Sequence, residues 1–532
     1  MVVNFVRKLI FMKLFKKIGI ALLSLAVLLV IINFGVSHYV SAKLPTIIKN
    51  EKGFPYNLNY KKLDVNILTG SFVMHEAYLA PKDTIQEAVK NGVFGQIKSI
   101  SVSGLNLWQL YKHNRIKVSR VIIDTPEIIM YHREKKYNVK DDVEKPFKNV
   151  IETGSLEVRH GSFNMVDAKK NPLLKASNIM FDLNNITVDS ASVKENVPVR
   201  YRDYSFACDS LFYDAGQFYN ITLKNITSTD STLAINNFRM IPKHSRTQFV
   251  KAIDKELDQF NLQAGKITVP KADWGFVNNI LYVHAPEMTL DKVFANIYRS
   301  KQPADDPSRK KLYSELLRSV KFDLKVDKLM IKNSLIEYEE QLNFSKPAAK
   351  VTFSKFYATV AKVYSPVNKK EALPATTIDV QCLFMKKAPL TVKWSFNTPD
   401  VSDAFSIAGH LQNIKSEDVN PVSKPLMNAT TTGDLKDIRF VFNGNRERAT
   451  GTFAIKYEDL KVDIYKKDGK EKNKLISAVG NLLVKNDTDG DLKKVDVAVE
   501  RSKDKSVFNF LWKFVMEGLK QTVLPKVVGK NI

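Results

Sequence analysis

Residues that could carry catalysis or bind a metal ion are few and widely separated in this 532-residue chain. Its eight histidines are isolated, and none stands in HExxH or another short spacing that would direct two imidazoles at one metal ion. The sequence contains no GxSxG nucleophile elbow, no Walker A loop and no GxGxxG turn. It therefore offers no catalytic residue, no cofactor-binding residue and no metal ligand, and we expect a protein that is not an enzyme.

One acidic segment has a superficial likeness to a calcium-binding loop. It reads Asp487-Thr-Asp489-Gly490-Asp491. In an EF-hand loop the glycine stands at position six and a glutamate at position twelve. Here the glycine stands at position four and Ala498 at position twelve, so the bidentate carboxylate is missing. An Asp-Gly turn between two strands explains this segment better.

The chain has two cysteines, Cys208 and Cys382, and no CxxC pair. This spacing excludes a zinc site or a thioredoxin-type motif. A single disulfide could form between them in an oxidising compartment. Two separate buried thiols fit the sequence equally well, and the sequence leaves the choice open.

A basic leader and an apolar segment open the chain. Residues 1–17 contain five cations and no acidic residue, and residues 18–36 carry no charge. That uncharged run is close to the ~20 residues that a helix needs to cross a bilayer. The flanking cations predict a single-pass transmembrane helix at 18–36, with the leader in the cytoplasm and the bulk of the chain exported.

Two other interpretations of this segment stay open. Val40-Ser41-Ala42 has small residues where a signal peptidase would cut, so the leader could be a signal peptide cleaved after Ala42. Against cleavage, the apolar run is longer than the usual ~7–15-residue core of a signal peptide. A buried helix of a globular core is the third alternative.

Composition and charge limit the partners of the exported part. Hydrophobic residues make up 44% of the chain and aromatic residues 10%, which excludes a disordered protein. The formal net charge is +25, which suits anionic lipid headgroups or acidic polymers of a cell envelope. We expect no nucleic-acid partner, because the domain is exported and its lysines are spread along the chain.

Period-two alternation of apolar and polar residues dominates the chain beyond residue 55 and predicts half-buried β-strands. Leu390, Val392, Trp394 and Phe396 form one such series, and Phe453, Ile455 and Tyr457 form another. A segment rich in proline and charge at 301–311 predicts a linker between a β-rich region at 41–300 and a second at 312–500. One continuous sheet with a loop at that place is the alternative.

A short apolar unit recurs with constant internal spacing but irregular intervals between copies, which excludes a solenoid of fixed period. We interpret it as a strand–bend–strand element. The copies are Val65, Ile67, Gly70, Phe72, Met74; Val121, Ile123, Pro126, Ile128, Met130; Leu156, Val158, Gly161, Phe163, Met165; and Leu329, Ile331, Ser334, Ile336, Tyr338, with a near-copy at Leu211, Tyr213, Gly216, Phe218, Asn220. Ordinary hairpins of an antiparallel protein are the simpler explanation of the same pattern.

Helical periodicity is confined to a few segments, at 245–260, 312–320 and 506–524. The last predicts an amphipathic helix that ends before Pro525. Two functions suit such a helix: an interfacial or partner-docking helix, or a cap on the end of the sheet. Its predicted apolar face consists of Phe508, Leu511, Trp512, Val515 and Leu519.

Taken together, the leader at 13–36, the strand–bend–strand units and the segment 390–464 resemble the AsmA-like family of bacterial envelope proteins, and most closely its versions in Bacteroidota. The units with the strongest likeness are residues 121–131, with the central Pro126, and 329–338. In 390–464, Leu390-Thr-Val-Lys-Trp-Ser-Phe, Phe405-Ser-Ile-Ala-Gly409-His-Leu and residues 449–457 follow in the family's order. The chain departs from the family's lipid-bridging members in being much shorter.

The resemblance implies a mainly β fold, with an N-terminal transmembrane helix followed by a long, curved, mostly antiparallel sheet that forms an open apolar groove. It implies an inner-membrane protein with its bulk in the periplasm, which binds or conducts phospholipid and contributes to lipid transport and outer-membrane maintenance. The family brings no catalytic residue and no cofactor.

Alternation along the strands directs some apolar side chains into the expected groove. The candidates for lipid contact are Ile128, Phe163, Ile336, Val392 and Trp394. The alternative function is a structural or assembly factor of the envelope, which would act through a protein partner docked at residues 506–524.

Overall fold

Strands make up 65% of the residues that the computed structural model describes, so the predicted mainly β fold is confirmed. The structure describes residues 56–66, 69–81, 92–113, 115–132, 150–192, 195–197, 199–367, 372–465 and 487–523. The leader, the expected transmembrane segment at 18–36 and the cleavage site after Ala42 lie outside these residues. Within them, no helix has the length and apolar character needed to cross a membrane.

The chain divides into two compact units, Val2–Phe238 and Arg239–Ile532, called here the N-terminal and C-terminal units. β10 (Thr232–Pro242) contains the boundary. The described elements of the N-terminal unit are β1 (Tyr56–Asn59), β2 (Lys62–Asn66), β3 (Ser71–Pro81), β4 (Gly92–Ser103), α4 (Leu107–His113), β5 (Arg115–Tyr131), β6 (Val150–Val166), β7 (Pro172–Val188), β8 (Asp203–Asp214) and β9 (Tyr219–Thr229).

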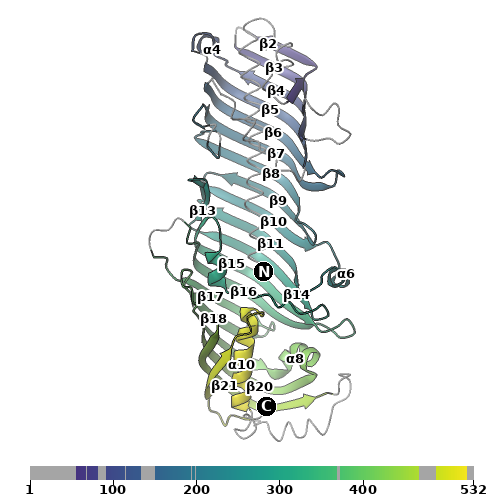
Figure 1. The fold of residues 1–532 in the computed structure, drawn as a ribbon, viewed down its shortest axis with the longest axis vertical. Helices are drawn as coiled ribbons and strands as arrows, with labels where there is room; N and C mark the ends of the chain where they lie inside the picture. The colour runs from purple at the N-terminus through teal and green to yellow at the C-terminus, as the bar shows by residue number, and fades with distance from the viewer. Residues whose placement is uncertain are drawn as a thin grey trace. The chain divides into compact units, whose positions relative to one another are not determined.

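The C-terminal unit contains the longest described strand and most of the described helices (Figure 1). Its elements are α6 (Arg246–Lys251), β11 (Asp258–Pro270), β12 (Asp273–Val277), β13 (Ile280–Ala285), β14 (Met288–Ser300), α7 (Tyr313–Arg318), β15 (Asp323–Gln341), β16 (Ala349–Tyr364), β17 (Thr376–Phe384), β18 (Ala388–Phe396), β19 (Phe405–Lys415), the 3-10 helix η3 (Ser416–Val419), α8 (Asn420–Met427), β20 (Ala429–Gly444), β21 (Arg448–Ile464), β22 (Lys493–Glu500) and α10 (Val507–Val523).

Each unit has an open, curved sheet in which antiparallel and parallel pairs are mixed. Strands β3 to β9 pair in chain order, and so do strands β15 to β22. The β5–β6 pair is parallel, and β15 runs parallel to both β13 and β14. A parallel pair needs a crossover of a dozen or more residues, and the segments 132–149 and 301–322 have this length. The sheet is mixed, and most of its described strand pairs are antiparallel, as expected.

The recurrent apolar unit is a bulged strand in three of its copies. Thr125, His160 and Asn333 have φ values of 50°, 52° and 51° and interrupt the alternation of β5, β6 and β15. Each stands directly before the central residue of its unit, between two apolar residues that are five positions apart. The extra residue resets the phase of the strand, so both halves present their apolar side chains on the same face. The other two copies are hairpins, which turn at Gly70 and Gly216 with φ values of 60° and 81°.

The bulges of neighbouring strands lie beside one another in the sheet. In the β5–β6 register the unpaired positions after Asp124 and Arg159 coincide, and in β6–β7 the unpaired His160 and Asn178 lie on either side of the Gly161–Ile179 pair. The His160 Nδ1 lies 3.1 Å from Asn178 Oδ1, and Asn178 Nδ2 donates to Asp209 Oδ2 at 2.9 Å. These polar side chains satisfy one another along a seam that crosses the strands of the N-terminal unit.

One expected helix is much shorter than its periodicity predicts. At 245–260 only α6 is helical, and it starts at a capping box in which Ser245 and Gln248 bond reciprocally. Phe260 belongs instead to β11, where it pairs with Ile297 of β14. The prediction is wrong beyond Lys251, because pairing with β14 overrides a helical spacing that the sequence permits locally. The helices at 312–320 and 506–524 are present as α7 and α10.

The expected linker at 301–311 lies inside the C-terminal unit and runs beside the segment before α10. The Lys310 amide donates to the Lys503 carbonyl at 2.8 Å, and Arg501 Nη2 donates to the Lys310 carbonyl at 2.5 Å. Lys505 and Asp305 form an ion pair at 3.2 Å. The residues that suggested a domain boundary therefore attach the β14–β15 crossover to the C-terminal segment, whereas the two units divide at 238/239.

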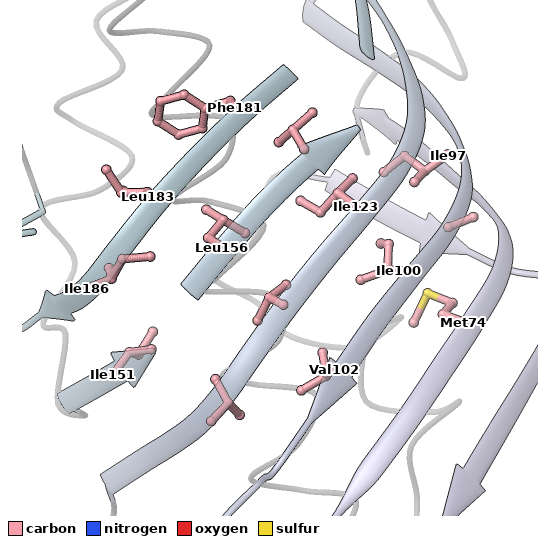
Figure 2. Close-up of a cluster of buried hydrophobic side chains, with 14 of the residues drawn as sticks. Met74, Ile97, Ile100, Val102, Ile123, Ile151, Leu156, Phe181, Leu183 and Ile186 are labelled. Carbon is pink, nitrogen blue, oxygen red and sulfur yellow. The ribbon is translucent and has the colours of Figure 1, made fainter. Parts of the chain in front are cut away.

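The core of the N-terminal unit is built by apolar side chains from one face of its strands. Figure 2 shows Met74, Ile100 and Ile123 projecting from neighbouring strands into one cluster with Leu156 and Phe181. Val121 is fully buried and Ile123 is 1% exposed. Alternation therefore places a continuous apolar layer on one side of this sheet.

Candidate functional site

Cross-strand registers arrange the apolar side chains of the N-terminal unit in rows. One row runs through Met74, Ile100, Ile123, Val158, Phe181 and Phe206, each opposite the next. A second row contains two of the predicted lipid-contact residues, since Ile128 of β5 stands directly opposite Phe163 of β6. Phe163 is buried at 8% exposure, and Ile128 is half-buried. Both lie on the apolar face that the alternation predicts.

The strands of the C-terminal unit show the same pattern. Its central row joins five strands: Leu262 of β11, Ala295 of β14, Ile336 of β15, Phe353 of β16 and Phe384 of β17. The next row contains Phe260, Ile297, Tyr338 and Val351. We call these two rows the apolar floor. With strands about 4.8 Å apart, five strands extend over about 19 Å.

The apolar floor is only partly covered. Ile336, Tyr338 and Phe353 are half-buried, as are most of their neighbours in the two rows, whereas Phe260 is buried. Phe353 and Phe384 contact each other with ring centroids 5.7 Å apart. Apolar side chains in a protein core are normally buried to a greater extent than this. The floor is therefore a sheet face whose apolar side chains keep part of their surface accessible.

The opposite face of the same strands is polar and more deeply buried. Glu337 and Glu339 of β15 are 7% and 8% exposed. Arg246 of α6 forms a bidentate ion pair with Glu339, at 3.0 and 2.8 Å, and its guanidinium lies 4.3 Å from the ring centroid of Tyr298. Lys350 reaches Glu337 at 2.7 Å. Arg246 of α6 therefore contacts the polar face, although the apolar face has the greater tendency to leave water.

Electrostatics keep this polar cluster ionised. Burial alone would raise the pKa of Glu339, but hydrogen bonds from Arg246 and Asn296 and the charge of Arg246 outweigh it and lower that pKa. The Asn296 Nδ2 donates to Glu339 Oε1 at 2.7 Å. The cluster is thus a satisfied structural network that holds α6 on the sheet.

Two other predicted lipid-contact residues, Val392 and Trp394 of β18, lie where helices cover the apolar face. The Trp394 ring contacts Tyr313 of α7 edge-to-face at 5.1 Å and Phe508 of α10 at 6.4 Å. Both residues pack against the core cluster that includes Phe442, Phe453 and Phe510. At this end of the sheet the apolar surface is used for packing rather than left accessible.

Helix α10 presents to the sheet a face one residue away from the predicted one. Its buried residues are Val507, Phe510, Phe514, Gly518 and Thr522. Leu511, Val515 and Leu519 flank this stripe and pack against the same core. Phe508 and Trp512 are 60% and 45% exposed. The helix contacts β20, β21 and β22, so it covers the end of the sheet and leaves two aromatic side chains outside.

Conventional reactive groups do not gather in the described part of the chain. No group of three or more His, Cys, Asp or Glu residues there could hold a metal ion. Cys208 and Cys382 are separate, buried thiols. Burial raises the pKa of Cys382 to about 11 and also raises that of Cys208, so neither is activated as a nucleophile.

Sequence reasoning missed the charged groups at the end of the apolar floor. They are Asp258, Arg299 and Glu340, which follow Phe260, Ile297 and Tyr338 in register on the same face. Each stands two residues from an apolar residue of its own strand. This spacing predicts that the charged and the apolar side chain lie on the same face of the sheet, and it was the signal that the sequence offered. Their gathering depends on the parallel pairing of β14 with β15, and alternation alone does not reveal strand order.

Comparison with protein-family models and with curated proteins found no match for this chain.

Proposed function

We propose that this protein binds phospholipid acyl chains on the apolar floor of its C-terminal unit and has no catalytic activity. The wider role that suits this binding is lipid transport and outer-membrane maintenance in a bacterial envelope. In this proposal an N-terminal helix at 18–36 anchors the chain in the inner membrane, and the two β-rich units lie in the periplasm. The resemblance to AsmA-like proteins supports this setting.

The observation that carries the proposal is the inverted burial of β14, β15 and β16. On these strands the charged side chains of Glu337 and Glu339 are buried, while Ile336 and Phe353 on the other face stay half-buried. Leaving apolar surface in water costs about 25 cal/mol for each Å². An apolar ligand would remove this cost, and no polar substrate would.

The dimensions of the floor suit a single acyl chain. Its rows extend over about 19 Å, against about 15 Å for half of a ~30 Å bilayer core. A chain lying across β11 to β17 would contact five strands. The short aliphatic and aromatic side chains of the rows provide contact without a fixed hydrogen-bond pattern, which suits a ligand with few polar groups.

Lipid analysis of the purified full-length protein tests the proposal. The protein is extracted in detergent, exchanged extensively, and its bound lipid is quantified by mass spectrometry beside a single-pass membrane protein with an unrelated soluble domain. We expect about stoichiometric phospholipid, well above the control. Phospholipid at the level of the control, on a folded protein, would contradict acyl-chain binding.

A second function, as a structural or assembly factor, is favoured by the exposed aromatic residues of α10. Trp512 borders a shallow hollow of about 400 Å³ between α10 and β22, lined also by Val499, Met516 and Lys520. Aromatic side chains at a concave surface are frequent anchors of protein interfaces. Substituting Phe508 and Trp512 by serine should then abolish co-purification of an envelope protein and leave bound lipid unchanged.

A further inference from the structure

The apolar floor ends abruptly in a row of charged side chains. Along β11, β14 and β15 the row of Phe260, Ile297 and Tyr338 is followed on the same face by Asp258, Arg299 and Glu340, which stand opposite one another in register. We call this second row the charged rim. In β16 the rim ends at Ala349, which stands opposite Glu340. The alanine side chain is too small to cover the Glu340 carboxylate.

The rim contains one neutralised pair and one carboxylate without a cation. Arg299 donates to Asp258 through Nε at 2.7 Å and through Nη2 at 2.8 Å. Glu340 accepts a hydrogen bond from the Tyr338 hydroxyl at 3.0 Å, and no described Lys, Arg or His forms an ion pair with it. Burial and the Glu340 carboxylate raise the pKa of Tyr338, so this phenol remains a donor.

The charges of the rim alternate from strand to strand: negative at Asp258, positive at Arg299, negative at Glu340. The hydrogen bonds of Arg299 to Asp258 use Nε and Nη2, and a guanidinium has five N–H groups in all. Its Nη1 is thus available to a phosphate oxygen. Glu340, about 4.8 Å away on the next strand, offers an acceptor for an ammonium group.

We propose that the charged rim selects a zwitterionic phospholipid headgroup, with the phosphate at Arg299 and a primary amine at Glu340. This inference rests on the proposed acyl-chain binding and adds the class of headgroup. A phosphate linked to an amine by two carbons carries a negative and then a positive charge, which complements the positive Arg299 and the negative Glu340. An anionic headgroup without an amine would place only hydroxyl groups beside the Glu340 carboxylate and gain no compensating charge.

Headgroup competition on the full-length protein tests the inference. The protein in detergent is equilibrated with equal amounts of phosphatidylethanolamine and phosphatidylglycerol that have identical acyl chains, and the bound lipids are extracted and quantified. We expect the ethanolamine lipid to be enriched roughly three- to fivefold, in keeping with a partly exposed ion pair. Glu340→Gln should reduce this ratio to about one.

The matched control is Asp379→Asn, which removes an exposed carboxylate of β17 on the opposite face. It should keep the ratio of the parent protein. Bound lipid with a ratio of about one in the parent, or a ratio that Glu340→Gln leaves unchanged, would overturn the headgroup assignment while acyl-chain binding stands. An absence of bound lipid in every variant would overturn both.

Discussion

Ile336 is the residue at which a substitution should most clearly change lipid binding without changing stability. Its side chain lies in the middle of the apolar floor and is half-buried, whereas Phe163, the corresponding residue of the recurrent unit in β6, is 8% exposed. A charge introduced at a half-buried position can still reach water, and one introduced into a core cannot. The same substitution should thus have different consequences at these two sites.

We expect Ile336→Asp to lower bound phospholipid at least fivefold with little change in the unfolding temperature, because it places a carboxylate where an acyl chain would lie. Phe163→Asp should destabilise the protein by more than about 3 kcal/mol. Quantified lipid and urea denaturation of each variant measure the two effects. Leu335→Asp, the neighbouring residue on the other face, is the control. Full lipid content in Ile336→Asp would count against the apolar floor as the binding surface.

The Glu339 carboxylate predicts a specific dependence of stability on pH. Hydrogen bonds and the charge of Arg246 lower its pKa in the folded protein from the ordinary value of 4.5. A lowered folded pKa stabilises the protein above the unfolded value, and this contribution is lost as pH falls through 4.5 and below. We therefore expect the difference in unfolding free energy between the parent and Glu339→Gln to be largest near neutral pH and to shrink below about pH 4. Urea unfolding at several pH values measures it, and a constant difference would refute the assignment.

At the scale of elements, α10 combines two kinds of surface. Gly518 faces the sheet, where an added Cβ would stand 2.3 Å from Cγ of the fully buried Phe453. Only glycine allows the helix to approach the strand so closely. Phe508 and Trp512, on another side of the helix, leave much of their surface outside.

We expect Gly518→Ala to destabilise the protein by about 1–3 kcal/mol, although alanine is the better helix former. The clash with a buried ring outweighs the gain in helix propensity. Trp512→Ser, at an exposed position, should change stability by less than about 0.5 kcal/mol. Chemical denaturation compares both with the parent. A stabilised Gly518→Ala variant would show that α10 moves away from β21 at little cost.

How far the sequence predicts the elements depends on the range of the interactions. Alternation correctly predicts β18 and β21, because the apolar or polar character of each residue indicates which face of the strand it occupies. The 245–260 helix fails beyond Lys251 because the pairing of Phe260 with Ile297 is made by a distant strand. The face of α10 is displaced by one residue because Phe510 and Phe514 meet the rings of β20 and β19, which no local pattern encodes.

At the scale of the whole molecule, stability and ligand binding should be linked. A ligand that binds only the folded state stabilises it by RT ln(1 + [L]/Kd), about 2.7 kcal/mol at one hundred times Kd. The half-buried apolar floor binds nothing once its strands separate. We therefore expect removal of bound phospholipid to lower the unfolding temperature of the full-length protein, and its addition to restore it.

Differential scanning calorimetry before and after delipidation makes this measurement. Ile336→Asp serves as the reference, because its unfolding temperature should be insensitive to added lipid. Equal lipid-induced shifts in the parent and in Ile336→Asp would indicate that lipid acts elsewhere on the chain.

The candidate site is predictable in kind but not in detail. Residue patterns give an apolar sheet face, and they place Ile128, Phe163 and Ile336 on it. They do not show that Arg246 of α6 pairs with Glu339 on the polar face, nor that α7 and α10 contact Trp394. The charged rim escapes prediction for the same reason, as its members come from strands that are joined by long crossovers.

The left-handed residues inside the strands determine which face of the sheet each following side chain occupies. Thr125, His160 and Asn333 each keep the two halves of a long strand in phase. Deleting one of them would move every following side chain of its strand to the opposite face of the sheet. Apolar residues beyond the deletion would then lie on the polar face, and polar residues would lie on the apolar face. A deletion in a hairpin turn shifts no strand in this way. Insertions and deletions should therefore be tolerated at the turns but not at these left-handed residues. In related chains of different length, these residues should keep their positions relative to the flanking apolar residues.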